Sequence, residues 1–146
     1  MEPPFERVYT VHDWYDGPRA GFADFRGRPH AYVARWREDL DDWEAAFQLS
    51  PITTEQLALV LEDWAIWQRW ERAVRAGETT EAEHPALPAD AERHAMLAPQ
   101  LAALLVPDRP SAGRALAEFR AAGGRPVDPT LASSERLLEV RWTPLP

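Results

Sequence analysis

The chain of 146 residues contains no cysteine, no lysine and no asparagine, so all of its 16 basic residues are arginine. Without cysteine, these residues can form no thiolate nucleophile, no disulfide and no thiolate zinc site. Without lysine they offer no Schiff base, no pyridoxal attachment and no P-loop. Without asparagine there is no N-glycosylation sequon. Several classes of enzyme are therefore excluded before any motif is considered.

The charge and the hydropathy of the chain indicate which classes of binding partner are not expected. The 16 basic residues face 24 acidic ones, which gives a net charge of −8. Because an acidic chain repels phosphate backbones, we expect no nucleic-acid partner. The longest apolar runs fall far short of the roughly 20 residues that a membrane-spanning helix needs, so no membrane contact is expected. The segment Met1-Glu2-Pro3-Pro4 lacks the features of a signal peptide. The sequence predicts a cytoplasmic protein.

The length and the composition predict one domain over residues 1–146. Apolar residues make up 45% of the chain, which is ordinary for a globular protein. Lysine and asparagine are absent and isoleucine is rare. These three residues have AT-rich codons, so their scarcity is typical of a GC-rich bacterial genome.

The first fifty residues have the pattern of β-strands. Four segments are rich in β-branched and aromatic residues or alternate in polarity, namely 8–15, 19–25, 28–37 and 43–50. Arg26-Gly27 fits a two-residue hairpin turn. With that turn, Ala23 pairs with His30, and Phe25 lies on the same face of the sheet.

Helical spacing begins after these strands. Thr53 and Gln56 fit a capping box, and Gly77 fits a helix end, so we expect a long tryptophan-rich helix over residues 53–77. Leu61 and Trp64 are expected to be nearly fully buried against the sheet.

The same helix carries a second apolar stripe formed by Leu59, Ile66 and Trp70. One sheet face cannot cover both stripes, so this second one must meet either the next helix or another chain. We expect it to form the interface of a weak symmetric homodimer, with Trp70 near the two-fold axis.

The remainder of the chain completes an α+β fold. A second helix is expected over residues 90–105, kinked by Pro99. Residues 114–122 fit either a strand or a helix, and a final strand follows near residues 138–142. The predicted fold is a curved antiparallel sheet, open or closed into a partial barrel. It has four N-terminal strands and one or two C-terminal strands, packed on the long helix and the kinked one.

Titratable and aromatic residues are concentrated between residues 11 and 30, around the turn at Gly17. Such crowding beside a turn is typical of a binding or catalytic site. Its imidazoles and carboxylates are metal-ligand types, but their spacing matches no metal motif, so we predict neither a metal nor a cofactor. The candidate binding residues are His12, Asp13, Tyr15, Asp16, Arg19 and His30.

Three motifs resemble a small bacterial family of hypothetical proteins. They are the run VHDWYDGPRAGFADFRGRPH, the later LEDWAIWQRWE, and HPALP. The family pattern is a D-[WY]-Y-D-G-P loop, a G-x-A-D-[FY]-x-G-x-P-H hairpin and an E-D-W-x-I-W helix, and the resemblance spans roughly residues 9–90. It implies common descent and carries no assigned activity.

These observations predict a non-enzymatic interaction module of the bacterial cytoplasm. Its His12–Arg19 region would contact a protein partner or a small polar ligand. One version is an inhibitor or immunity protein that neutralises a basic toxin. The alternative is a small hydrolase-like enzyme that uses His12 or His30 with a nearby aspartate. Convergence of these side chains on a concave pocket would favour the enzyme, and a flat acidic surface would favour the binding module.

Overall fold

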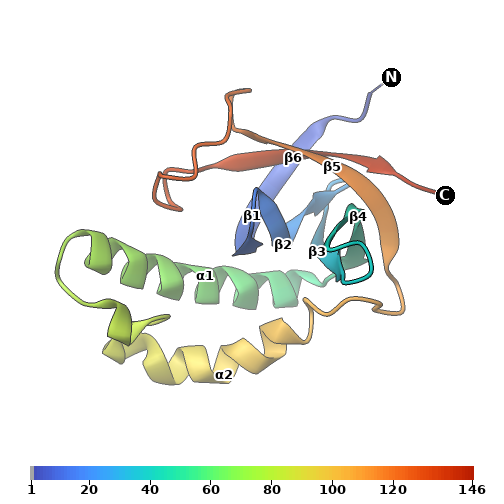
Figure 1. Cartoon of the computed structure of the whole chain (residues 1–146). Helices are drawn as coiled ribbons and strands as arrows, with labels where there is room; N and C mark the ends of the chain where they lie inside the picture. Colours follow the sequence, from blue (N-terminus) through green and yellow to red (C-terminus); the bar gives the residue numbers. More distant parts are fainter. Residues whose placement is uncertain (1) are drawn as a thin grey trace.

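Six antiparallel strands close into a barrel, and two helices are inserted between the fourth and fifth strands (Figure 1). The computed structural model describes residues 2–146, and Met1 lies outside that range. The elements are β1 (Phe5–Trp14), β2 (Pro18–Phe25), β3 (Arg28–Arg37), β4 (Asp42–Pro51), α1 (Thr54–Arg75), the short 3-10 turns η1 (Glu81–Glu83) and η2 (Pro88–Asp90), α2 (Ala91–Ala102), β5 (Gly113–Ala121) and β6 (Leu138–Pro144).

The predicted α+β class is confirmed, with four N-terminal strands, two C-terminal strands and a long helix of 22 residues. The sheet is a closed barrel rather than a partial one, because β6 pairs with β1 and leaves no free edge. Of residues 114–122, which the sequence left open between strand and helix, 114–121 belong to strand β5. Among the described residues, no helix combines the length and the apolar character that crossing a bilayer requires.

The β2–β3 hairpin has the predicted register. Ala23 pairs with His30 and Phe25 pairs with Arg28. The turn residues Arg26 and Gly27 have φ values of 54° and 75°, as a two-residue turn with the twist of a hairpin requires. Alternation of side chains then sends one face of the hairpin into the barrel and the other toward the helices.

The inside of the barrel is filled by four aromatic rings, those of Tyr32, Phe47, Phe119 and Trp142. All six pairs of these rings have centroids 5.8–5.9 Å apart and are tilted or edge-to-face. Trp142 is 1% exposed, and its Nε1 donates a hydrogen bond of 3.0 Å to the carbonyl of Asp24. The barrel is therefore a packed core.

A glycine lets Tyr32 reach the barrel wall. The Tyr32 hydroxyl donates a hydrogen bond of 2.7 Å to the carbonyl oxygen of Thr10, and burial raises the pKa of this phenol. A Cβ atom on Gly21 would lie 2.2 Å from that carbonyl oxygen and 2.5 Å from the hydroxyl. Only a residue without a side chain leaves room for this contact.

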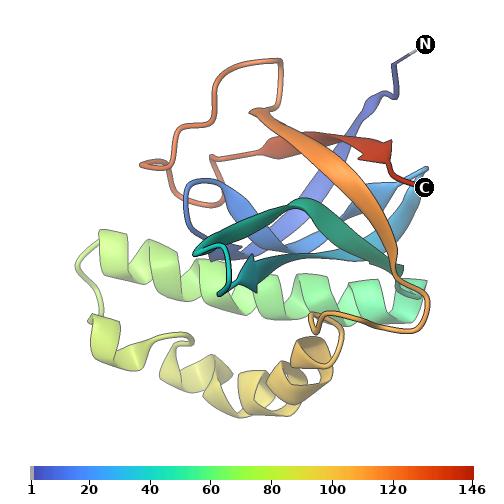
Figure 2. The same cartoon turned by 45° about the vertical axis from the view of Figure 1, so that its right-hand side comes forward.

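The two helices form successive layers outside the barrel. α1 lies across the barrel wall, and α2 lies on the far side of α1 (Figures 1 and 2). The predicted capping box is present, since Thr53 Oγ1 accepts from the Gln56 amide at 3.0 Å and Gln56 Oε1 accepts from the Thr53 amide at 2.9 Å. α2 is shorter than the predicted 90–105 helix and contains Pro99.

The two apolar stripes of α1 have the opposite environments from those predicted. Leu61 and Trp64 are only half-buried, because the barrel and α1 leave space between them. On the second stripe, Ile66 is 1% exposed and packs against Leu97 of α2, and Trp70 is 8% exposed. Within the same chain, α2 and the 80–90 connection therefore cover Ile66 and Trp70, whereas Leu59 is half-buried. This packing argues against the predicted interface of Leu59, Ile66 and Trp70, and the homodimer itself stays a prediction.

Candidate functional site

A cavity of about 390 Å³ lies between the end of β1 and the middle of α1. It is lined by side chains from β1, α1 and α2, from the connection between the two helices, and from the connection between β5 and β6. The principal ones are His12, Trp14, Asp63, Trp64, Trp67, His84, His94 and Arg136. Three of the four histidines of the chain therefore line one cavity.

One wall of this cavity is aromatic. Trp64 and Trp67 are three residues apart on α1, a spacing that places side chains on neighbouring positions of a helix surface. Their rings are stacked, with centroids 4.9 Å apart and an interplanar angle of 22°. The His12 ring meets Trp64 at 5.4 Å and Phe22 at 5.6 Å in edge-on geometry. The wall therefore presents flat apolar surfaces.

His12 is a neutral imidazole at neutral pH. The protein surrounding its ring disfavours the charged form and lowers its pKa from 6.5 to about 4, although the nearby Asp63 carboxylate opposes this shift. The side chain is nevertheless exposed to the cavity, so solvent there moderates the desolvation. A neutral imidazole offers one hydrogen-bond donor and one acceptor.

The other wall of the cavity holds a histidine oriented by a carboxylate. His94 Nδ1 on α2 lies 2.7 Å from Asp63 Oδ1 on α1. Because a carboxylate oxygen accepts hydrogen bonds, the tautomer assigned to His94 carries its hydrogen on Nδ1 and donates this hydrogen bond to Asp63. Asp63 itself is buried, at 8% exposure. The pair fixes the orientation of the imidazole and leaves Nε2 for another partner, an arrangement used in acid–base catalysis and in ligand binding.

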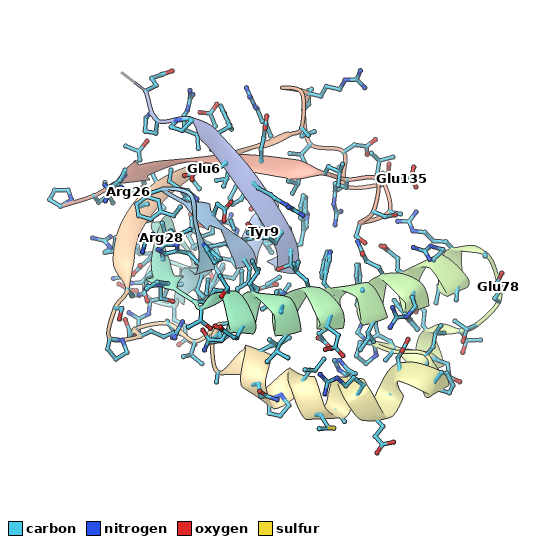
Figure 3. The ribbon with its side chains drawn as sticks, turned by 180° about the vertical axis from the view of Figure 1, so that it is seen from behind. Glu6, Tyr9, Arg26, Arg28, Glu78 and Glu135 are labelled. Atoms are coloured by element: carbon cyan, nitrogen blue, oxygen red, sulfur yellow. The ribbon has the colours of Figure 1, made fainter. Side chains whose placement is uncertain are left out.

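A second cavity of about 290 Å³ continues along α1. It shares Val11, Trp64 and Arg136 with the first cavity, and we refer to the two together as the α1 groove. Figure 3 shows Tyr9, which lines the second cavity, at the α1 side of β1, and Glu135 in the connection before β6.

Hydrogen bonds attach that connection to α1. The Ser133 amide donates to Glu71 Oε1 at 3.0 Å, and the Ser133 hydroxyl donates to the same oxygen at 2.7 Å. Gln68 Nε2 donates to the Ser133 hydroxyl at 3.2 Å. These contacts hold one side of the second cavity in place.

The predicted His12–Arg19 region is divided between two places. His12 lines the α1 groove, whereas Tyr15, Asp16 and Arg19 line a different cavity of about 610 Å³ at the mouth of the barrel. There Arg19 forms an ion pair with Asp16, and Tyr15 is 67% exposed.

The remaining predicted residues lie outside the α1 groove as well. Asp13 is exposed and lines neither of its cavities. His30 lies near the Arg26–Arg28 turn, at the opposite side of the molecule from Glu135 (Figure 3). Its Nδ1 is 2.8 Å from the Arg28 carbonyl oxygen.

The sequence interpretation missed the most specific members of the site, Asp63, Trp67 and His94. One signal was present, since Asp63 shares a helix face with Val60 and Trp67 and is a carboxylate among apolar residues. In addition, across residues 2–146, no three histidine, aspartate or glutamate side chains lie close enough to hold a metal ion.

Comparisons with protein-family models, with curated proteins and with solved structures give no match to this chain.

Proposed function

We propose that this protein is a non-enzymatic binding module that holds a small heteroaromatic ligand in the α1 groove. The observation that carries the proposal is the stacked pair Trp64 and Trp67, which lines the same cavity as the neutral His12 and the Asp63–His94 pair. A small polar ligand is also what the sequence predicts, but most of the residues proposed to contact it lie on α1 and not at the Gly17 turn.

The two walls suit the two features of a nitrogen-containing ring. A planar ring gains dispersion and burial against aromatic faces, and ring N–H and N atoms need partners such as the imidazoles of His12 and His94. The volume of about 390 Å³ falls within the roughly 300–1,000 Å³ typical of small-ligand sites. An apolar wall with a few oriented polar groups is the usual composition of such a site.

Calorimetric titration with indole and benzimidazole tests the proposal. We expect both compounds to bind, and Trp64→Ala to weaken binding by about tenfold, since a stacking contact contributes about 0.5–1.5 kcal/mol beyond area burial. Trp36→Ala is the matched control, because Trp36 is 40% exposed and lines neither cavity of the groove. Absence of binding, or equal affinity in Trp64→Ala and the wild type, would overturn the proposal.

The Asp63–His94 pair favours acid–base hydrolysis as a second candidate function. Among the hydrogen bonds of residues 2–146, the aspartate partner belongs to His94 and not to His12 or His30, the histidines named from the sequence. Hydrolysis of p-nitrophenyl acetate and p-nitrophenyl phosphate tests this candidate. A rate that disappears in His94→Gln supports an enzyme, and a wild-type rate equal to the buffer rate rejects one for these ester classes.

A further inference from the structure

We infer that the ligand carries an anionic group beside its ring, and that Arg7 and Arg136 bind this group in the second cavity of the α1 groove. The inference rests on the proposed function, because it assigns the ring to the first cavity. Carboxylate and phosphate share the required chemistry, which is a compact anion with several acceptor oxygens.

The two cavities are placed so that one molecule can occupy both. They share Val11, Trp64 and Arg136, so a ring against the Trp64–Trp67 wall lies next to the second cavity. A substituent of the ring that points along α1 would enter it. Arg136 lines both cavities and lies where the ring and its substituent would meet.

The second cavity has a one-sided charge. Arg7 and Arg136 line it, together with Gln68 and Ser133, and its described lining contains no acidic residue. The chain as a whole has a net charge of −8, so a cavity whose charged lining is only basic differs in sign from the rest of the protein. Their electrostatic potential favours an anion at this place.

Both guanidinium groups are held in place without being neutralised. Arg136 Cζ lies 4.7 Å from the centroid of Trp14, and Arg7 Cζ lies 4.6 Å from that of Tyr9. Among the ion pairs of residues 2–146, neither arginine has a carboxylate partner. One Arg136 nitrogen donates to the Pro129 carbonyl at 3.2 Å. Stacking on an aromatic face leaves the edge N–H donors of a guanidinium free for an anion.

Two nearby carboxylates, those of Glu71 and Glu139, already accept hydrogen bonds from other groups. Glu71 accepts both hydrogen bonds from Ser133. Glu139, which lies opposite Arg7 in the β1–β6 ladder, accepts from Arg120 at 2.5 Å. These partners reduce the tendency of either carboxylate to neutralise the two arginines of the groove.

A charge series on one ring tests the inference by calorimetric titration. The probes are indole, indole-3-acetate, 3-indoxyl phosphate and tryptamine. We expect at least one of the two anions to bind about tenfold more tightly than indole, because a hydrogen bond to a charged group contributes about 1.5–3 kcal/mol. Tryptamine should bind more weakly than indole. Arg7→Gln should remove most of the gain, and Arg28→Gln, the same change at a residue that lines neither cavity of the groove, should keep it.

The outcomes separate this inference from the proposed function. Indole that binds without any gain from an anionic group overturns the inference alone, as does a gain that survives in the Arg7→Gln/Arg136→Gln double variant. Absence of binding by all four probes overturns both. The stronger of the two anions identifies the ligand as a carboxylate or a phosphate, and thermal unfolding of each variant verifies that it remains folded.

Discussion

The barrel interior and the α1 groove are built from the same residue types and differ in how completely they are filled. In the barrel, Tyr32, Phe47 and Trp142 are between 0% and 5% exposed. In the groove, Trp64 and Trp67 are half-buried beside cavities of about 290 and 390 Å³. Tryptophan therefore serves stability in one region and presents a contact surface in the other.

The difference follows from the shape of the two regions. A closed barrel surrounds its core on all sides, so four rings can contact one another in every pairing. α1 instead meets the curved outer wall of the barrel, and the connection between β5 and β6 loops out beside that wall (Figure 2). A helix against a curved surface leaves open space at its flanks, and aromatic side chains there remain accessible.

The largest loss of stability is expected for Trp142→Ala. This change removes a buried ring from the barrel core and leaves the Asp24 carbonyl without its donor. We expect a decrease in the free energy of unfolding of about 3–5 kcal/mol. Urea denaturation measures it, and a loss below about 1 kcal/mol would show that the barrel is not the stabilising core.

Gly21→Ala is expected to cause the next largest loss of stability, although it adds a single methyl group. The new Cβ would lie 2.2 Å from the Thr10 carbonyl oxygen, so the β1–β2 backbone or Tyr32 must move. We expect a loss of about 1–3 kcal/mol, measured by the same denaturation. Gly27→Ala is not an equivalent control, because Gly27 has a positive φ of 75°. Gly113→Ala, with open space around its Cβ, is the matched control and should leave stability nearly unchanged.

A smaller loss of stability is expected for Trp64→Ala, which is the same substitution as Trp142→Ala in the other region. Because Trp64 is half-buried beside two cavities, little additional void forms, and we expect about 1–2 kcal/mol. A loss equal to that of Trp142→Ala would assign Trp64 to the core and remove the distinction between the regions.

The smallest effect concerns His12 and pH. Its pKa is lowered in the folded protein from 6.5 to about 4, so the unfolded chain binds more protons between these two values. The stability contributed by neutral His12 is therefore complete above pH 6.5 and decreases as the pH falls toward 4. The effect is reduced by the exposure of the ring to the cavity. The free energy of unfolding is measured against pH for the wild type and for His12→Gln, and the difference between the two curves gives the contribution of His12. Identical curves would contradict the lowered pKa of His12 in the folded protein.

Most of the fold could be predicted from the sequence, because its signals are local. The hairpin at Arg26-Gly27, the capping box at Thr53 and the polarity alternation of the strands are each encoded within a few residues. Closure of the barrel is different, since it depends on pairing between β1 and β6, the first and last strands of the chain. Likewise, which of the two α1 stripes is buried depends on where α2 packs, and no local sequence pattern indicates that position.

The site was harder to predict for the same physical reason. The concentration of titratable residues around Gly17 identified His12, but alternation along a strand and the following turn send its neighbours to the barrel mouth. The partners of His12 come from α1, α2 and the connection before β6, between 51 and 124 residues further along the chain. Asp63 and His94 are brought together only by the packing of the two helices.

We propose that the α1 groove, and not the barrel mouth, binds the ligand. The seven tryptophans provide a direct test, because each side-chain N–H gives its own signal in a two-dimensional ¹H–¹⁵N NMR spectrum. On titration with indole-3-acetate, we expect shifts for Trp64 and Trp67 and unchanged signals for Trp36 and Trp142. The rings of Trp36 and Trp43 lie 6.5 and 6.1 Å from that of Tyr15 at the barrel mouth. Shifts confined to these two tryptophans, with Trp64 and Trp67 unchanged, would place the ligand at the barrel mouth and overturn the proposal.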